Sequence, residues 1–136
     1  GPQVHLWSAA IEGEDGSGSY AVVAADHSAV WYGRFFDDDR IRVAGDLVSA
    51  EQSAAEKAVW IGMKALSTVG DGGHLTITTT CPHLHLDPLR RAGARQGVIV
   101  DVIVDEDDRA IRLAETPGFQ RWQDTDLASL IHDEEV

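Results

Sequence analysis

Cysteine and long apolar runs are what this sequence of 136 residues lacks most clearly. Its single cysteine, Cys81, excludes an internal disulfide framework and fits a reducing compartment, so we predict a cytoplasmic protein. No apolar run approaches the ~18 residues that are needed to cross a bilayer, and no charged-then-apolar leader opens the chain. We therefore expect no association with a membrane.

Basic residues are also scarce, with 11 Lys and Arg against 23 Asp and Glu, which gives a net charge of −12. A field of that sign repels phosphate backbones, so nucleic-acid binding would require a local basic patch. The best candidates for such a contact are Arg90, Arg91 and Arg95. Salt bridges from these arginines to the many surface acids are an equally good interpretation.

Length and composition predict one globular domain. The chain is long enough to bury a core, and its 43% hydrophobic and 25% charged residues are ordinary for a soluble protein. Residues 1–2 look like the remnant of a cleaved tag, which would make the chain an excised part of a longer protein. We expect the domain to cover residues 3–116, followed by a C-terminal extension over residues 117–136 with a short helix and a frayed acidic end.

The clearest signal of secondary structure is a helix over residues 49–66. Ser49 and Gln52 have the spacing of a capping box, which marks a helix start. Small or apolar residues then recur at spacings of three and four, so they share one face: Ala55, Ala58, Val59, Gly62, Met63 and Leu66. Lys57 and Lys64 are expected on the opposite side.

The rest of the chain reads mainly as strands. Alternating or β-branched patterns predict strands at residues 4–11, 20–25, 29–36 with a continuation at 41–44, 75–80 and 98–104. Two further helices are predicted at residues 87–92 and 106–115. This order predicts an α/β fold with a mixed five-stranded sheet: strands one to three are antiparallel, strands four and five are parallel, and helices flank both faces.

This order of elements resembles the ribonuclease H fold, and local stretches resemble the type I family over residues 3–115. In that family the first strand ends in an aspartate, the long helix carries a glutamate in its first turns, the fourth strand closes on Asp-Ser, and the final helix carries an aspartate two residues before Leu-Ala. The stretches that resemble these elements, together with the glycine-rich hairpin, are residues 4–9, 13–20, 49–66, 77–81 and 108–114.

The resemblance implies two-metal hydrolysis, in which several carboxylates hold two Mg²⁺ ions about 4 Å apart. At the matching positions this sequence has Ala9, Ala55, Thr80 and Ile111. Three of these side chains offer no ligand, and the fourth offers one neutral hydroxyl. The family's histidine loop is also missing, because residues 105–107 follow the last strand directly. We therefore expect neither the catalytic residues nor the metal cofactor at these positions.

Relocated acids keep a hydrolytic alternative open. Shifting the helix match by one residue brings Glu56 into the position of the family's glutamate. Further acids follow strands whose carboxyl ends share one edge of an open sheet, namely Glu12, Glu14, Asp87, Asp105 and Asp107. If these side chains gathered, the chain would be a divergent RNA–DNA hybrid nuclease that uses Mg²⁺ or Mn²⁺.

A second cluster of potential metal ligands lies in residues 81–87. Cys81, His83 and His85 alternate along the chain, so an extended segment would place them on one side, where Zn²⁺ could bind with Asp87 or water. The spacing matches no established zinc pattern. The alternation also fits two intervening leucines that face inward, histidines that face outward, and a buried structural thiol.

Our leading interpretation is a catalytically inactive ribonuclease H-like domain that acts as an interaction module. A protein partner or a homodimer is favoured, because the net charge opposes nucleic acid. Four aromatic residues are candidate interface anchors, although core packing is the default role for each: Trp31, Tyr32, Trp60 and Trp122.

Overall fold

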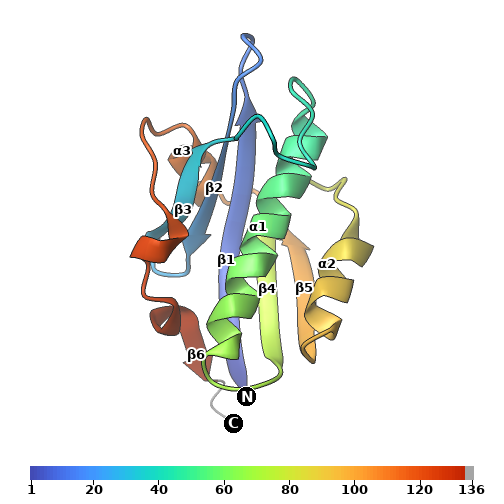
Figure 1. The fold of residues 1–136 in the computed structure, drawn as a ribbon, viewed down its shortest axis with the longest axis vertical. Helices are drawn as coiled ribbons and strands as arrows, with labels where there is room; N and C mark the ends of the chain where they lie inside the picture. The colour runs from blue at the N-terminus through green and yellow to red at the C-terminus, as the bar shows by residue number, and fades with distance from the viewer. Residues whose placement is uncertain (134–136) are drawn as a thin grey trace.

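The computed structural model describes residues 1–133 and has an α/β fold built on a six-stranded mixed sheet (Figure 1). The first three strands are antiparallel neighbours, and the fourth and fifth run parallel to the first. This confirms the predicted fold class. The strands are β1 (Pro2–Glu12), β2 (Gly18–Ala24), β3 (Ala29–Arg34), β4 (Gly73–Thr79), β5 (Val98–Val104) and β6 (Ile131–Asp133), in the order β3-β2-β1-β4-β5 with β6 paired to β1.

Helices cover both faces of the sheet. The long helix α1 (Leu47–Ser67) lies along β1, and α2 (Leu86–Ala94) packs beside α1 and against β5 (Figure 1). The short helix α3 (Arg109–Ala114) packs on β1 and β2 from the opposite side. Even- and odd-numbered residues of β1 point to opposite faces, so Leu6 belongs to the core under α1 whereas Ala9 packs against α3.

The main core lies between α1 and the sheet. Its largest fully buried side chains include Leu6, Ile61, Leu75 and Ile77, each of which stabilises the fold by roughly 1.5–3 kcal/mol. Gly62 lets α1 approach the sheet closely, because a Cβ at this position would lie 2.3 Å from Cδ1 of Leu75. The small residues on the predicted helix face therefore have a packing role.

The start of α1 corrects the predicted capping box. The N-cap is Asp46, and Ser49 lies inside the helix, where its hydroxyl donates to the Asp46 carbonyl and accepts the Val43 N–H. Gln52 reaches across to another loop, donating to the His85 carbonyl at 3.1 Å and accepting the His85 N–H at 2.8 Å. Both polar side chains bind backbone groups outside the helix, so their spacing predicted the wrong partners.

The loop before α1 is organised by Asp39. Its carboxylate accepts backbone N–H groups from Ile41 and Arg42 and side-chain donors from Ser53 and Lys57. Residues 41–44 form an irregular loop and no strand, because this carboxylate takes N–H groups that a strand would donate to its neighbour. Lys57 is half-buried against this carboxylate, which differs from the predicted exposed position.

The last part of the chain completes the sheet. After α3, Gln120 pairs with Tyr32 at the edge of β3 through backbone bonds in both directions. Two short 3₁₀-helices follow, Trp122–Asp124 and Leu127–Leu130, and then β6 pairs with the first residues of β1. Leu130 is buried in the main core. The segment expected as a C-terminal extension thus packs on the domain, as far as residue 133.

The first and last described strands are neighbours in the sheet, where Pro2 of β1 pairs with Asp133 of β6. The acidic end that was expected to fray, residues 134–136, lies outside the described residues. Within residues 1–133, no helix is both long enough and apolar enough to cross a membrane.

Candidate functional site

A buried carboxylate lies between the start of α1 and the carboxyl end of β1. Glu51, on the second turn of α1, is 5% exposed and faces β1. Its Oε1 accepts the backbone N–H of Ala10. Burial raises the pKa of Glu51, and the hydrogen bond from Ala10 only partly opposes this effect. The side chain therefore ties the helix to the sheet.

Four further buried side chains at the ends of β1 and β4 are neutral. Ser8 and Ala10 are buried on the α1 side of β1, and Thr79 and Cys81 are buried where β4 ends. The Thr79 hydroxyl accepts the Cys81 N–H at 3.0 Å. Burial raises the pKa of the Cys81 thiol, and the nearby charge of Glu51 raises it further. This central site offers one carboxylate, two hydroxyls and a protonated thiol.

This donor set does not fit two magnesium ions. Mg²⁺ prefers anionic oxygens in an octahedral shell, and a two-metal centre requires several carboxylates. Glu51 supplies one, and it already accepts a backbone N–H. Nowhere in residues 1–133 do three or more His, Cys, Asp or Glu side chains form a group that could hold a metal ion.

The four positions that match the family's acids are not gathered in one place. Ala9 packs with Val23 and Ala110 on the α3 face, where Ile111 lies beside them. Ala55 is on the opposite face, in the core beneath α1, and Thr80 follows the end of β4. The acid of α1 that faces the sheet is Glu51, which the sequence reasoning missed.

Glu12, the first candidate for a relocated acid, is in an ion pair. Arg42 binds both of its carboxylate oxygens at 2.8 Å, and Gly45 donates its N–H to one of them. The hydrogen bond from Arg42 lowers the pKa of Glu12. This pair joins the end of β1 to the loop before α1. Glu56 lies elsewhere, on the outer side of α1, where it accepts an N–H of Gln52.

Asp107, another candidate for a relocated acid, belongs to a stack on the α3 face. Hydrogen bonds from Arg109 hold the pKa of Asp107 at about 2. The Arg109 guanidinium lies 3.7 Å from the centre of the Trp7 ring, and Trp7 stacks on His5 at 3.8 Å. Glu12, Glu56 and Asp107 are therefore in three separate environments. The remaining acids, Glu14, Asp87 and Asp105, are exposed.

Residues 81–87 do not form a group that could bind metal in the described structure. Cys81 is buried, while His83 and His85 are exposed. The leucines between them, Leu84 and Leu86, pack against the main core. The alternation places leucines inward and histidines outward.

The arginines of α2 form a local basic patch. Arg90, Arg91 and Arg95 are exposed, and none of them makes an ion pair with an acid in the described part of the chain. The alternative that they bind neighbouring surface acids is therefore not realised. They remain available to an external anion.

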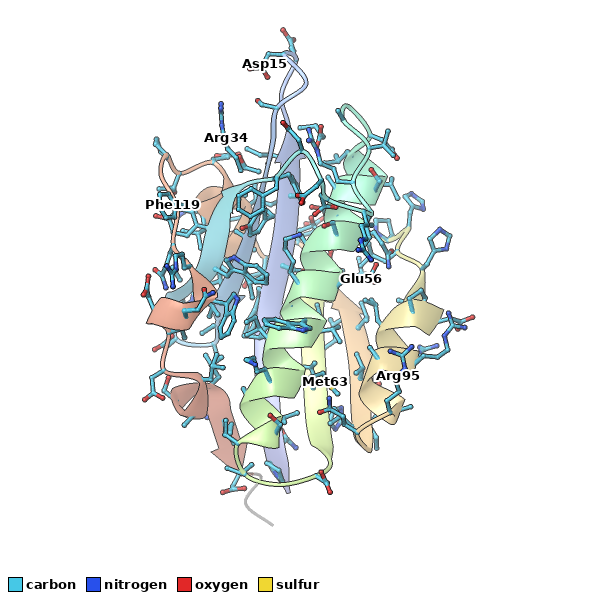
Figure 2. The ribbon with its side chains drawn as sticks, in the orientation of Figure 1. Asp15, Arg34, Glu56, Met63, Arg95 and Phe119 are labelled. Atoms are coloured by element: carbon cyan, nitrogen blue, oxygen red, sulfur yellow. The ribbon has the colours of Figure 1, made fainter. Side chains whose placement is uncertain are left out.

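A groove runs between α1 and α2 beside this basic patch. It has a volume of about 370 Å³, and Figure 2 shows Glu56 toward one end and Met63 and Arg95 toward the other. We call it the α1–α2 groove. Its lining includes Val59, Trp60, Met63, Leu89, Ala92 and Arg95.

A larger open cleft of about 1200 Å³ lies at the edge of β3, where residues 114–123 cross from one face of the sheet to the other. Phe36 and Phe119 line it and are 74% and 73% exposed. Figure 2 shows Phe119 and Arg34 on this side of the molecule, far from the α1–α2 groove. The sequence patterns did not identify either phenylalanine, because exposure of a single residue in a loop leaves no periodic signal.

No protein-family model matches the chain, and no curated protein matches it either.

Proposed function

We propose that this chain is a catalytically inactive domain of the ribonuclease H-like fold that serves as a protein-interaction module. The strand order β3-β2-β1-β4-β5, with a long helix over the central strand, supports the fold assignment. The environment of Glu51 supports the lack of catalysis. The burial and hydrogen bonding of Glu51 are the observation on which the proposal mainly depends.

Glu51 has a structural task. A carboxylate that binds a metal must be charged and must turn its oxygens toward the ion. Glu51 is buried, its pKa is raised by burial, and it accepts a backbone N–H. The buried side chains Ser8, Thr79 and Cys81 bring no second negative charge at neutral pH. The free energy needed to bury two divalent ions here would exceed the free energy gained from a single carboxylate ligand.

The surface favours a protein as the partner. Exposed aromatic and arginine side chains, which dominate the energetics of protein interfaces, occur around both the α1–α2 groove and the cleft at the β3 edge. A long nucleic acid would have to approach a chain of net charge −12. Arg90, Arg91 and Arg95, on α2 and just after it, are exposed and make no ion pair within residues 1–133.

The proposed lack of catalysis is tested by incubating the full chain with an RNA–DNA hybrid in Mg²⁺ and, separately, in Mn²⁺. We expect the hybrid to remain intact. Cleavage that is lost in Glu12→Gln, Glu56→Gln or Asp107→Asn would establish the nuclease alternative, because these are the acids that a relocated site would use.

The choice of partner class is tested by gel shifts with duplex, hybrid and single strands at two salt concentrations. We expect no shift at physiological salt. A salt-dependent shift that disappears in an Arg90→Glu, Arg91→Glu and Arg95→Glu triple variant would make nucleic acid the partner.

A further inference from the structure

We propose that two copies of this chain exchange their C-terminal segments and so form a dimer. The exchanged element is residues 119–133, which we call the C-terminal strap. The segment that changes direction is residues 115–118, which we call the hinge. This inference rests on the proposed interaction role and names the partner as a second copy of the chain.

The C-terminal strap is held by residues that are distant in sequence. Gln120 exchanges two backbone hydrogen bonds with Tyr32, and its side chain donates to the Ala29 carbonyl at 2.9 Å. The Thr125 hydroxyl donates to the Val30 carbonyl at 3.0 Å, and β6 pairs with the first residues of β1. None of these bonds requires the strap to belong to the same chain. The strap of a second copy can therefore make all of them identically.

Apolar contacts strengthen the same attachment. Leu130 is buried in the main core, and Trp122 packs edge-on against Trp60 of α1 with ring centres 5.0 Å apart. The Lys64 ammonium lies 5.2 Å from the centre of each of these two rings. A chain with a released strap would expose the site of Leu130 to water. Such a chain is driven either to close again or to accept the strap of another copy.

The hinge, in contrast, is attached only to α3. All four of its residues are exposed. Within residues 1–133 its hydrogen bonds all go to carbonyls of α3: the Glu115 N–H binds Ile111, and Thr116 binds Leu113 through its N–H and Arg112 through its hydroxyl. Gly118 has a φ of +90°, and a Cβ there would meet no atom within 4 Å. A change in the direction of the hinge thus breaks no hydrogen bond to the sheet.

An exposed aromatic residue lies where the hinge meets the strap. Phe119 is 73% exposed, and Phe36, which lines the same cleft at the β3 edge, is 74% exposed. Figure 2 shows Phe119 on the segment that passes outside β3. In an exchanged dimer the two hinges cross from one copy to the other at this place. We therefore expect the exposed phenylalanines to be covered where the two copies meet.

A second copy fits the strap site better than a strand of another protein does. The site requires a residue that pairs with Tyr32, an indole beside Trp60, a leucine in the core and a strand next to β1. These requirements occur at fixed spacings along one segment. A second copy meets every one of them by identity, and its strap makes no contact that is new to the fold.

Disulfide trapping in the full chain tests the exchange directly. Gln3→Cys with His132→Cys places thiols on paired residues of β1 and β6, in a Cys81→Ser background that removes the native thiol. A closed monomer forms this disulfide within one chain, whereas an exchanged dimer forms it between two. The variant is refolded from urea at micromolar and at millimolar concentration and separated by non-reducing electrophoresis. We expect the share of covalent dimer to rise with concentration.

A matched cysteine pair controls for random oxidation. Ser19→Cys with Arg34→Cys links paired residues of β2 and β3, outside the hinge and the strap. This disulfide stays within one chain in both forms, so we expect covalent monomer at both concentrations.

Deletion of Pro117 and Gly118 adds a second readout. It shortens the hinge by about 7 Å, so the strap should no longer reach the site on its own chain. We expect analytical ultracentrifugation to show a folded dimer. If the shortened chain does not fold, the disulfide result alone decides.

The proposal is overturned if the disulfide between positions 3 and 132 stays within one chain at millimolar concentration. It is also overturned if the control pair gives as much covalent dimer, or if the shortened chain is a folded monomer. These outcomes are independent of the hybrid-cleavage assay. Cleavage would refute the inactive domain, whereas a lack of exchange would refute only this choice of partner.

Discussion

The carboxylate of Glu51 accepts the backbone N–H of Ala10 and so joins the second turn of α1 to the carboxyl end of β1. The N–H of Ala10 lies in the interior, where water cannot replace a lost partner. The bond thus gives a structural reason for an acid in the core.

Replacement of Glu51 by leucine should destabilise the chain by about 1–3 kcal/mol, because it leaves the Ala10 N–H without an acceptor. Glu51→Gln retains an acceptor oxygen and should be much closer to the unchanged chain. Urea denaturation at neutral pH measures both. A leucine variant as stable as the glutamine variant would contradict the structural role.

Glu51 also makes stability depend on pH. Burial raises its pKa in the folded chain above the ordinary value of 4.5, so the folded state binds more protons than the unfolded state over that interval. Its contribution is most favourable below about 4.5 and declines as the pH rises through the raised pKa. Glu51→Gln should flatten this part of the stability profile. An unchanged slope in the glutamine variant would show that another group is responsible.

Asp39 should stabilise the loop before α1 in the opposite pH range. Burial favours its protonated form, but donors that include Arg42 and Lys57 outweigh this and hold its pKa at about 2. Its contribution is present above the unfolded value of 3.8 and is lost as the pH falls toward 2. At neutral pH, Asp39→Ala should cost roughly 1–3 kcal/mol. The exposed neighbour Asp38 supplies the control, and equal effects of the two alanine variants would refute the assignment.

The C-terminal segment should be necessary for stability. Leu130 is 6% exposed in the main core, so Leu130→Ala should cost about 2–5 kcal/mol through lost burial and a cavity. Gln123→Ala, at an exposed position of the same segment, should change stability little. The melting temperatures of the two variants are compared by thermal unfolding, and we expect only Leu130→Ala to lower the melting temperature markedly. Similar melting temperatures would mean that the segment is only loosely attached.

Much of the fold could be predicted because its signals are local. The β-branched run of β4 and the small residues of α1 each specify an element and its buried face without knowledge of distant contacts. Ser49 and Gln52 failed as a capping box, because Ser49 binds backbone groups just before the helix and Gln52 binds a loop that is distant in sequence. The packing of residues 117–133 on the sheet could not be predicted either, because it depends on contacts with β1 and β3, which are distant in sequence.

The central site was harder to predict than the fold. A shift of one residue on a strand exchanges the faces of the sheet, which is why Ala9 and Ala10 differ in environment. A shift of one residue on a helix rotates a side chain by about 100°. The observed start of α1 at Leu47 turns Glu51 toward β1 and leaves Glu56 on the outer side. The Ala54-Ala55 pair that follows Glu51 was the available clue to this register.

The most direct test of the account is a titration of the full chain with Mn²⁺, followed by paramagnetic broadening of its amide signals. We predict no preferential broadening of Ala10, Glu51 and Thr79, because the central site supplies a single, already hydrogen-bonded carboxylate. Selective loss of these three signals at low Mn²⁺, abolished in Glu51→Gln, would contradict the account.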